Sequence, residues 1–293
     1  MPWNQSSPSG RSVLKLLAVC VTAASISCAP ASPTKLPADA GQTIRCAVIG
    51  GVADAGLWQE LGNRFHSQTG RRIEIAARGP KHELVDGFQD EKCHLIAMHA
   101  SDTVINLVAD GHAVDPQPWA RNDFVLVGPT KDPAGVHGMT DAGKALKKII
   151  ESASPLLVQS SNGAMEVMRE VMEAEQLSFD PASTIVRLDD RHRQMLLEAG
   201  TEGAYTLVGR IPFLNGKLPK QDLKIMVQGD VRLRRPYVVA VASSTGHTAA
   251  EISATQSFVA FLRSEETQQW IATYGRGKYD DAPLFFRVAS SAQ

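Results

Sequence analysis

Short apolar runs that alternate with segments of helical periodicity constrain the fold of this chain more than any other feature. Most of the runs are separated by segments in which apolar residues recur three or four positions apart. Strands that alternate with helices in this way are typical of α/β proteins with parallel sheets. The predicted strands are 44–49, 72–76, 95–100, 124–127, 156–159, 184–188, 205–208, 223–227 and 237–242.

Glycine residues mark the ends of several predicted elements. The first predicted helix carries apolar residues four positions apart and ends at Gly70, the expected C-cap. The strand 44–49 runs into Gly50-Gly51, which predicts a tight turn before that helix. Gly128-Pro129 ends the strand 124–127. Two helices, at about 251–262 and 265–274, are predicted near the end of the chain.

The composition is that of a folded chain without a nucleic-acid-binding charge field. Hydrophobic residues make up 43% and charged residues 21% of 293 residues, which excludes a disordered chain. The chain has 30 basic and 31 acidic residues, which gives a net charge of -1, and only 6% of its residues are aromatic. We therefore expect no nucleic-acid partner.

Residues 1–28 have the pattern of a signal peptide. Arg11 and Lys15 are the only charged side chains there, and a short apolar stretch overlaps and follows them. This stretch is too short for a transmembrane helix, which needs about 20 apolar residues. The sequence Ser25-Ile26-Ser27-Cys28 resembles a bacterial lipobox in which Cys28 becomes the lipidated first residue, although a lipobox prefers Leu where Ser25 stands.

Two alternatives to lipidation stay open at this end of the chain. In the first, cleavage at Ala29-Pro30-Ala31 releases a soluble exported protein. In the second, the segment stays uncleaved as a membrane anchor. Residues 29–42 contain three prolines and are expected to form a tether. Beyond Cys28, Cys46 and Cys93 are the remaining cysteines, which either pair in an oxidising compartment or stay as buried free thiols.

Several segments together resemble the tungstate-binding family of ABC-importer substrate-binding proteins, relatives of the molybdate and phosphate binders. The resemblance runs in order from about residue 43 to 288, and the stretch from Asn122 to Pro129 is its most distinctive part. The matching segments read NDFVLVGP (122–129), KDPAGV (131–136), GAYTL (203–207) with Arg210, QGD (228–230) and RPYVV (235–239).

The resemblance implies a periplasmic-binding-protein type II fold with two lobes, each a mainly parallel sheet flanked by helices. Residues 43–127 plus 237–293 would form the first lobe, and residues 128–236 the second. Two hinge crossings would lie near Gly128 and Arg235-Pro236. Such proteins are usually monomers that close on a ligand by hinge motion and dock on a membrane permease. The expected location is periplasmic or extracytoplasmic.

The expected ligand is a small anion, with a tungstate- or molybdate-like oxyanion among the candidates. Backbone N–H groups at a helix N-terminus, with the helix dipole, favour a negative charge. Gly50 and Gly51 precede the first helix, and Ser160, Ser161, Asn162 and Gly163 precede another. The alternatives are a tight turn that requires glycine at the first place and simple N-capping at the second.

Both turns depart from the pattern of the tungstate binders. At the first, a threonine/serine run is replaced by Ile49-Gly50-Gly51-Val52, which has no hydroxyl. At the second, Val158-Gln159 replaces a segment that carries an arginine, and a neutral Gln cannot replace a guanidinium. These departures leave the identity of the anion open.

Thr206 and Arg210 stay near their positions in the resemblance, and Tyr205 is a further candidate. Arg210 is the candidate cation for the ligand, or else it forms a hinge or surface salt bridge. Thr206 is a candidate ligand contact, and Tyr205 belongs either to the cleft or to the core.

The predicted role is capture of an anion for an ABC permease. The alternative is a binding-protein fold that acts as a sensor or interaction lipoprotein without transport.

Catalytic, metal and cofactor motifs do not stand out in the sequence. The eight histidines show no metal-ligand spacing, and no nucleophile elbow or phosphate-binding glycine loop occurs. We therefore expect no enzyme activity, no metal ion and no cofactor.

Overall fold

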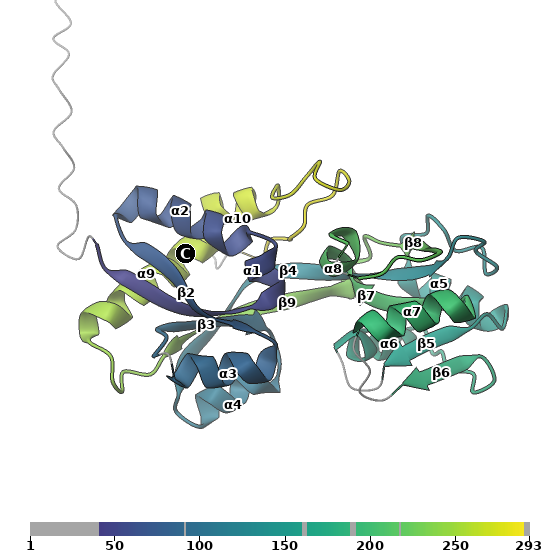
Figure 1. Ribbon diagram of the computed structural model, residues 1–293, viewed down its shortest axis with the longest axis horizontal. Helices are drawn as coiled ribbons and strands as arrows, with labels where there is room; N and C mark the ends of the chain where they lie inside the picture. Colours follow the sequence, from purple (N-terminus) through teal and green to yellow (C-terminus); the bar gives the residue numbers. More distant parts are fainter. Residues whose placement is uncertain (1–40, 91, 160–162, 188–191, 217, 290–293) are drawn as a thin grey trace, which may run out of the picture. The chain divides into compact units, whose positions relative to one another are not determined.

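The strands of the computed structural model form a seven-stranded sheet and a separate two-stranded sheet (Figure 1). The described residues all lie in one compact unit, and none of their helices has the length and apolar character needed to cross a membrane. The predicted signal peptide, with Cys28, and nearly all of the tether lie outside the described residues. The structure describes residues 41–90, 92–159, 163–187, 192–216 and 218–289.

The elements of the first part of the chain follow the predicted order, but the tight turn predicted at Gly50-Gly51 is instead the start of a short helix, Gly50–Asp54. Gly70 adopts φ 75° and donates its backbone N–H to the His66 carbonyl, so it is the predicted C-cap. The elements are β1 (Thr43–Ile49), α1 (Gly50–Asp54), α2 (Leu57–Thr69), β2 (Arg72–Gly79), α3 (Lys81–Asp90), β3 (Leu95–His99), α4 (Asp102–Ala109) and β4 (Ala113–Pro129).

The later elements are also close to prediction, apart from two short helices that the apolar pattern did not indicate, α8 and η1. They are α5 (Ala142–Glu151), β5 (Leu156–Gln159), α6 (Gly163–Ala174), β6 (Thr184–Arg187), α7 (His192–Glu202), β7 (Thr206–Gly209), α8 (Arg210–Leu214), β8 (Leu223–Val227), η1 (Val231–Leu233), β9 (Arg234–Ala242), α9 (Ala249–Arg263) and α10 (Glu265–Ile271).

The strand directions correct the expectation of mainly parallel sheets. β1 pairs in parallel with β2 and β3, and β5 pairs in parallel with β6. However, β9 is antiparallel to both β3 and β4, and β4 is antiparallel to β7 and β8. β8 and β9 are not paired with each other, because both pair with β4, at Leu126–Pro129 and at Ala113–Asp123, with the short η1 between them.

The strand β4 is much longer than predicted. It spans 17 residues, whereas the apolar run indicated only 124–127. Its first half was not predicted because it contains Pro116 and Pro118, and proline disfavours a strand interior. The structure accommodates them at two register shifts in the ladder with β9, where the pairing steps over irregular positions.

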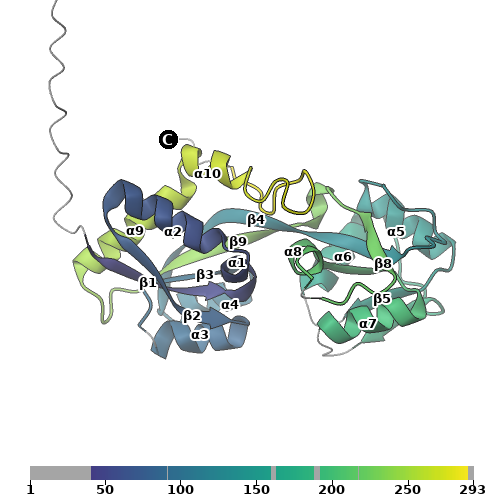
Figure 2. The same ribbon diagram turned by 45° about the horizontal axis from the view of Figure 1, so that its top comes forward.

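Helices cover both faces of the sheet around β1. Figures 1 and 2 show α2, α9 and α10 on one face, with α3 and α4 on the other. Trp58 lies at the centre of this core and meets Trp119 and Phe258 edge-to-face, with ring centroids 5.4 and 5.5 Å apart. Separate apolar clusters form between residues 124 and 233, around α5, α6 and α7.

Cys46 and Cys93 are both buried and are free thiols in the structure. Burial raises the pKa of the Cys46 thiol well above its ordinary value. Of the two alternatives drawn from the sequence, the structure therefore shows the free thiols rather than the disulfide.

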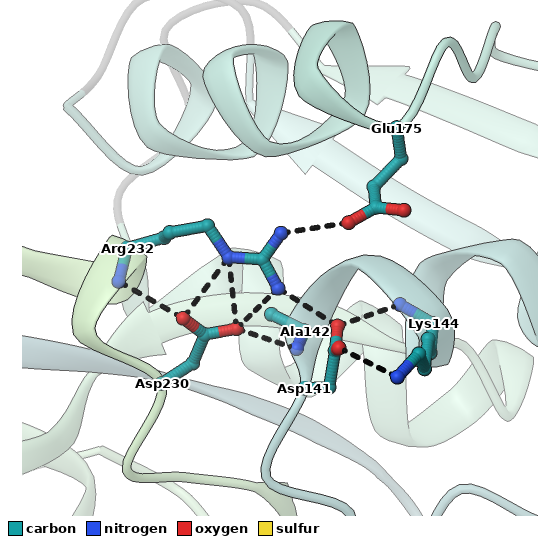
Figure 3. Close-up of polar contacts among 6 residues, drawn as sticks. All are labelled: Asp141, Ala142, Lys144, Glu175, Asp230 and Arg232. Atoms are coloured by element: carbon teal, nitrogen blue, oxygen red, sulfur yellow. Dashed lines mark hydrogen bonds and ion pairs between the residues drawn. The ribbon is translucent and has the colours of Figure 1, made fainter.

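Arg232 ties three elements together through carboxylates (Figure 3). Its guanidinium contacts Asp230 at 2.7 Å, Asp141 at 2.7 Å and Glu175 at 2.8 Å. Asp230 also accepts the Ala142 backbone N–H at 2.8 Å, and Asp141 caps α5. The backbone hydrogen bond to Asp141 and its pairing with Arg232 lower the pKa of this carboxyl to about 2.

We predict that Arg232→Met lowers the free energy of unfolding by about 1.5–3 kcal/mol near neutral pH, because it removes charge-assisted hydrogen bonds. Asp141 titrates at about pH 2 when folded. A carboxylate with a depressed pKa stabilises the fold above its unfolded pKa and loses that effect as the pH falls. The difference from the unmodified chain should therefore shrink between pH 5 and 2.

Urea unfolding at several pH values measures this difference. Lys144→Met is the matched control, because Lys144 also contacts Asp141, at 3.3 Å, but is largely exposed. It should change the stability by less than about 0.5 kcal/mol. If Arg232→Met changes the stability as little as the control is expected to, the Arg232 cluster does not stabilise the fold.

Candidate functional site

A cavity of about 510 Å³ brings together residues from distant parts of the sequence. Its wall includes the N-terminal ends of α3 and α6, the end of β3, and neighbouring positions of β4 and β9. The lining residues are Gly51, Lys81, His99, Asn122, Phe124, Gly163, Ala164, Glu166, Gly209, Ile211, Pro212, Leu218, Arg235 and Tyr237.

Lys81 and Arg235 supply two positive charges to this cavity. Neither makes an ion pair or a side-chain hydrogen bond with the part of the chain that the structure describes. Burial and the charge of Arg235 lower the pKa of Lys81, and burial lowers the pKa of Arg235. Partly desolvated cations without a carboxylate at contact distance are suited to bind an anion.

Arg235 lies directly against the first turn of α6. A Cβ on Gly163 would clash with the guanidinium, so a side chain at this helix N-terminus would require Arg235 to move. The register of the antiparallel ladder positions this side chain, because Arg235 on β9 is paired with Asn122 on β4. The guanidinium and the α6 dipole therefore favour negative charge at the same place.

Three uncharged polar side chains line the cavity beside the two cations. His99 stacks on Tyr237 with ring centroids 4.4 Å apart, and burial together with the charges of Arg235 and Lys81 lowers the pKa of His99 to about 3. The imidazole is therefore neutral at pH 7. The Asn122 side chain is only 8% exposed, and its Oδ1 accepts no hydrogen bond from the described residues. The oxygen itself is buried, so Asn122 faces the cavity with other atoms.

The predicted site residues divide into three groups. Gly51 and Gly163 line the cavity, and Gly50 lies beside Gly51 in α1. Ser160, Ser161 and Asn162 lie outside the described residues, immediately before Gly163. The cavity lining does not include Tyr205, Thr206 or Arg210.

Arg210 is bound within the protein. The guanidinium is 1% exposed, donates to the Pro283 carbonyl at 2.8 Å and pairs with Asp280. It thus connects α8 to the segment after α10. This geometry is that of the salt-bridge alternative considered from the sequence.

Tyr205 and Thr206 are also buried in the interior. The Tyr205 hydroxyl donates to Asp132 at 2.8 Å and accepts the Ala134 backbone N–H at 3.1 Å. Its ring occupies the space that a side chain at Gly128 would need. The Thr206 hydroxyl contacts Met195 Sδ at 3.9 Å. These contacts are those of core residues, which was the alternative for Tyr205.

One cluster outside the cavity has the composition of a metal site. Ligand atoms of His94, His247 and Glu251 lie within 4.8 Å of one another. However, His94 Nδ1 accepts the Arg45 backbone N–H at 3.0 Å, so the proton of the neutral ring is on Nε2, which faces Glu251 at 3.6 Å. A protonated Nε2 has no lone pair for a metal. The hydrogen bonding therefore does not fit a metal ion at this place.

Sequence reasoning missed most of the polar lining. Arg235 and Tyr237 were noted for the resemblance alone, and Lys81, His99 and Asn122 were not predicted as site residues. A signal was present in part, since Lys81 and His99 each lie at a strand–helix junction, next to the end of a strand in the sheet of β1.

The comparisons with known proteins agree with the resemblance. Residues 44–276 match the family model described as bacterial extracellular solute-binding protein. A Haloferax volcanii protein named for anion binding in an ABC transporter is 27% identical over 256 residues, or 85% of this chain and 73% of its own. The tungstate-binding protein TupA of Peptoclostridium acidaminophilum is 27% identical over 237 residues, or 80% and 82%.

Solved structures show the same fold. The tungstate-binding protein TupA from Desulfovibrio alaskensis G20 superposes with a TM-score of 0.68 at 22% identity, covering 85% of this chain and all of that one. The tungstate ABC transporter structure from Geobacter sulfurreducens gives 0.62 at 21% identity, over 79% and 98%. The two-lobed binding-protein fold predicted from the sequence is thereby confirmed. With a family match over most of its length, this chain belongs to the bacterial extracellular solute-binding proteins.

Proposed function

We propose that this protein is exported, binds a small anion in the cavity around Lys81 and Arg235, and presents it to the permease of an ABC importer. The observation that carries the proposal is the pair of cations without carboxylate partners among the described residues, beside the N-terminus of α6. An anion would supply the contact ion pair that these two charges do not form with the described residues. The relatives named for anion and tungstate binding support this class of ligand.

The same proposal includes two lobes that close on the ligand. We assign residues 43–127 plus 237–293 to the first lobe and residues 128–236 to the second, with β4 and β9 as the crossings. The distribution of apolar clusters supports this division, because one cluster consists of residues up to Ala120 and from Tyr237 onward, with Ile211 added. The other clusters lie between Phe124 and Leu233.

The ligand set that we propose keeps part of the predicted one. Gly50, Gly51 and Gly163 would offer backbone to the anion, and Ser160, Ser161 and Asn162 would contribute at the start of α6. Tyr205, Thr206 and Arg210 are assigned to the scaffold on the basis of their internal contacts.

Residues 1–28 would direct export, with Cys28 lipidated and residues 29–42 as the tether to the membrane. The protein would act as a monomer in the periplasm or outside the cytoplasm. The family description as extracellular supports this location.

A second candidate is a binding-protein fold that works as a sensor or interaction lipoprotein without transport. It is favoured by the first turn, where Ile49-Gly50-Gly51-Val52 offers no hydroxyl to an oxyanion. The two functions are separated by whether an anion binds and whether binding recruits a permease.

Thermal unfolding of the full chain against tungstate, molybdate, phosphate, sulfate and small carboxylates at ~1 mM tests the proposal. A ligand of micromolar affinity should stabilise the fold by roughly 4 kcal/mol. Lys81→Met or Arg235→Gln should weaken binding on the order of 10–100-fold, because each removes a charge-assisted contact.

The exposed Lys131 provides the control, and Lys131→Met should leave affinity unchanged. A flat response to every anion would reject anion capture and favour the second candidate.

We expect the opposite pattern for Arg210. Arg210→Met should lower the free energy of unfolding by about 1–3 kcal/mol, since it removes a buried ion pair and a hydrogen bond to Pro283, and should leave anion affinity within threefold. Urea unfolding and ligand titration measure the two effects separately. Arg72→Met, at an exposed position, is the control for loss of a positive charge. A tenfold loss of affinity in a variant that stays folded would return Arg210 to the ligand set.

A further inference from the structure

One side of the candidate cavity is apolar. Its wall includes four apolar side chains, those of Phe124 in β4, Ile211 and Pro212 in α8, and Leu218. They differ from the charged lining residues in offering no polar group. The cavity volume of about 510 Å³ lies in the range of ~300–1,000 Å³ that is typical of sites for organic molecules. A bare tetrahedral oxyanion needs hydrogen-bond donors around all its oxygens, and apolar side chains supply none.

The charges of the described lining residues sum to a single positive charge. Lys81 and Arg235 are cationic, and Glu166 in the first turn of α6 is the one carboxylate among the described lining residues. His99 is neutral, because its pKa lies at about 3. A site with this balance is neutralised by a monoanion, whereas a dianion would leave excess negative charge in a partly desolvated place.

We infer that the ligand is an organic monoanion: a carboxylate whose head lies between Lys81 and Arg235 and whose apolar body packs against Phe124, Ile211, Pro212 and Leu218. This inference rests on the proposed function, because it names the class of anion that the same cavity captures. It separates this protein from relatives named for tungstate, whose ligand is a small inorganic dianion.

Calorimetric titration of the full chain with straight-chain carboxylates from acetate to octanoate tests the apolar body. The dissociation constant should fall about fourfold for each methylene that becomes buried, until the cavity is filled. Tungstate and sulfate, at matched ionic strength, should bind more weakly than the best carboxylate.

The unmodified chain suffices for this series, so the result does not depend on a variant. Leu218→Ser should reduce the dependence on chain length and leave acetate unaffected, and Ile105→Ser, at a side chain that is 59% exposed, is its matched control.

A second experiment tests the charge balance. Glu166→Gln removes the one described carboxylate of the lining, so it should shift the preference from butyrate to succinate, which has the same number of carbons and one more charge, by about fivefold or more. Glu173→Gln, at an exposed position of the same helix, should leave the ratio unchanged.

The outcomes separate the two proposals. Binding of tungstate or sulfate but of no carboxylate, with a loss in Lys81→Met, would overturn the organic ligand and keep anion capture. Carboxylate binding that does not depend on chain length would overturn the apolar body. No binding of any anion would overturn the proposed function and the inference with it.

Discussion

The antiparallel ladder between β4 and β9 is the constraint on which the rest of this structure depends. It joins the strands of the N-terminal part, through β3, to β7 and β8 of the later part. It also carries Trp119 into the aromatic core around Trp58. Because the ladder pairs Asn122 with Arg235 and Ala120 with Tyr237, its register places three polar residues of the cavity within a few positions of one another. A slip by one residue would turn them to the opposite face.

The protein uses its partly or fully buried positive charges in two distinct ways. Arg210 and Arg232 contact carboxylates and hold distant segments together, so removing either leaves a partner charge without compensation. Lys81 and Arg235 form no ion pair with a described carboxylate, although the charge of Glu166 partly offsets the lowering of the pKa of both by burial. Their burial carries a desolvation cost that an anion can offset, which couples ligand binding to the stability of the fold. Gly163 allows this arrangement, because any side chain there would displace the Arg235 guanidinium.

Most elements could be predicted from local pattern, and the exceptions have physical causes. Apolar runs and the Gly70 cap identify strands and helices, because the spacing of nearby apolar residues predicts which face is buried and a glycine predicts where a helix ends. The first half of β4 was missed because Pro116 and Pro118 oppose a regular strand, and only tertiary pairing with β9 accommodates them at register shifts. The predicted strand directions were partly wrong, because an apolar run does not indicate whether its strand pairs in parallel or antiparallel with its neighbours.

The sequence by itself determined the α/β class, the family and the expectation of an anion, since these depend on local patterns and on motifs that stay in order along the chain. Only the tertiary structure decided which charges are available to a ligand. The sequence does not distinguish Arg210 from Arg235, yet Arg210 pairs with Asp280 whereas Arg235 lines the cavity. The difference arises from contacts between residues far apart in the chain, and no local pattern records whether a guanidinium finds a carboxylate after folding.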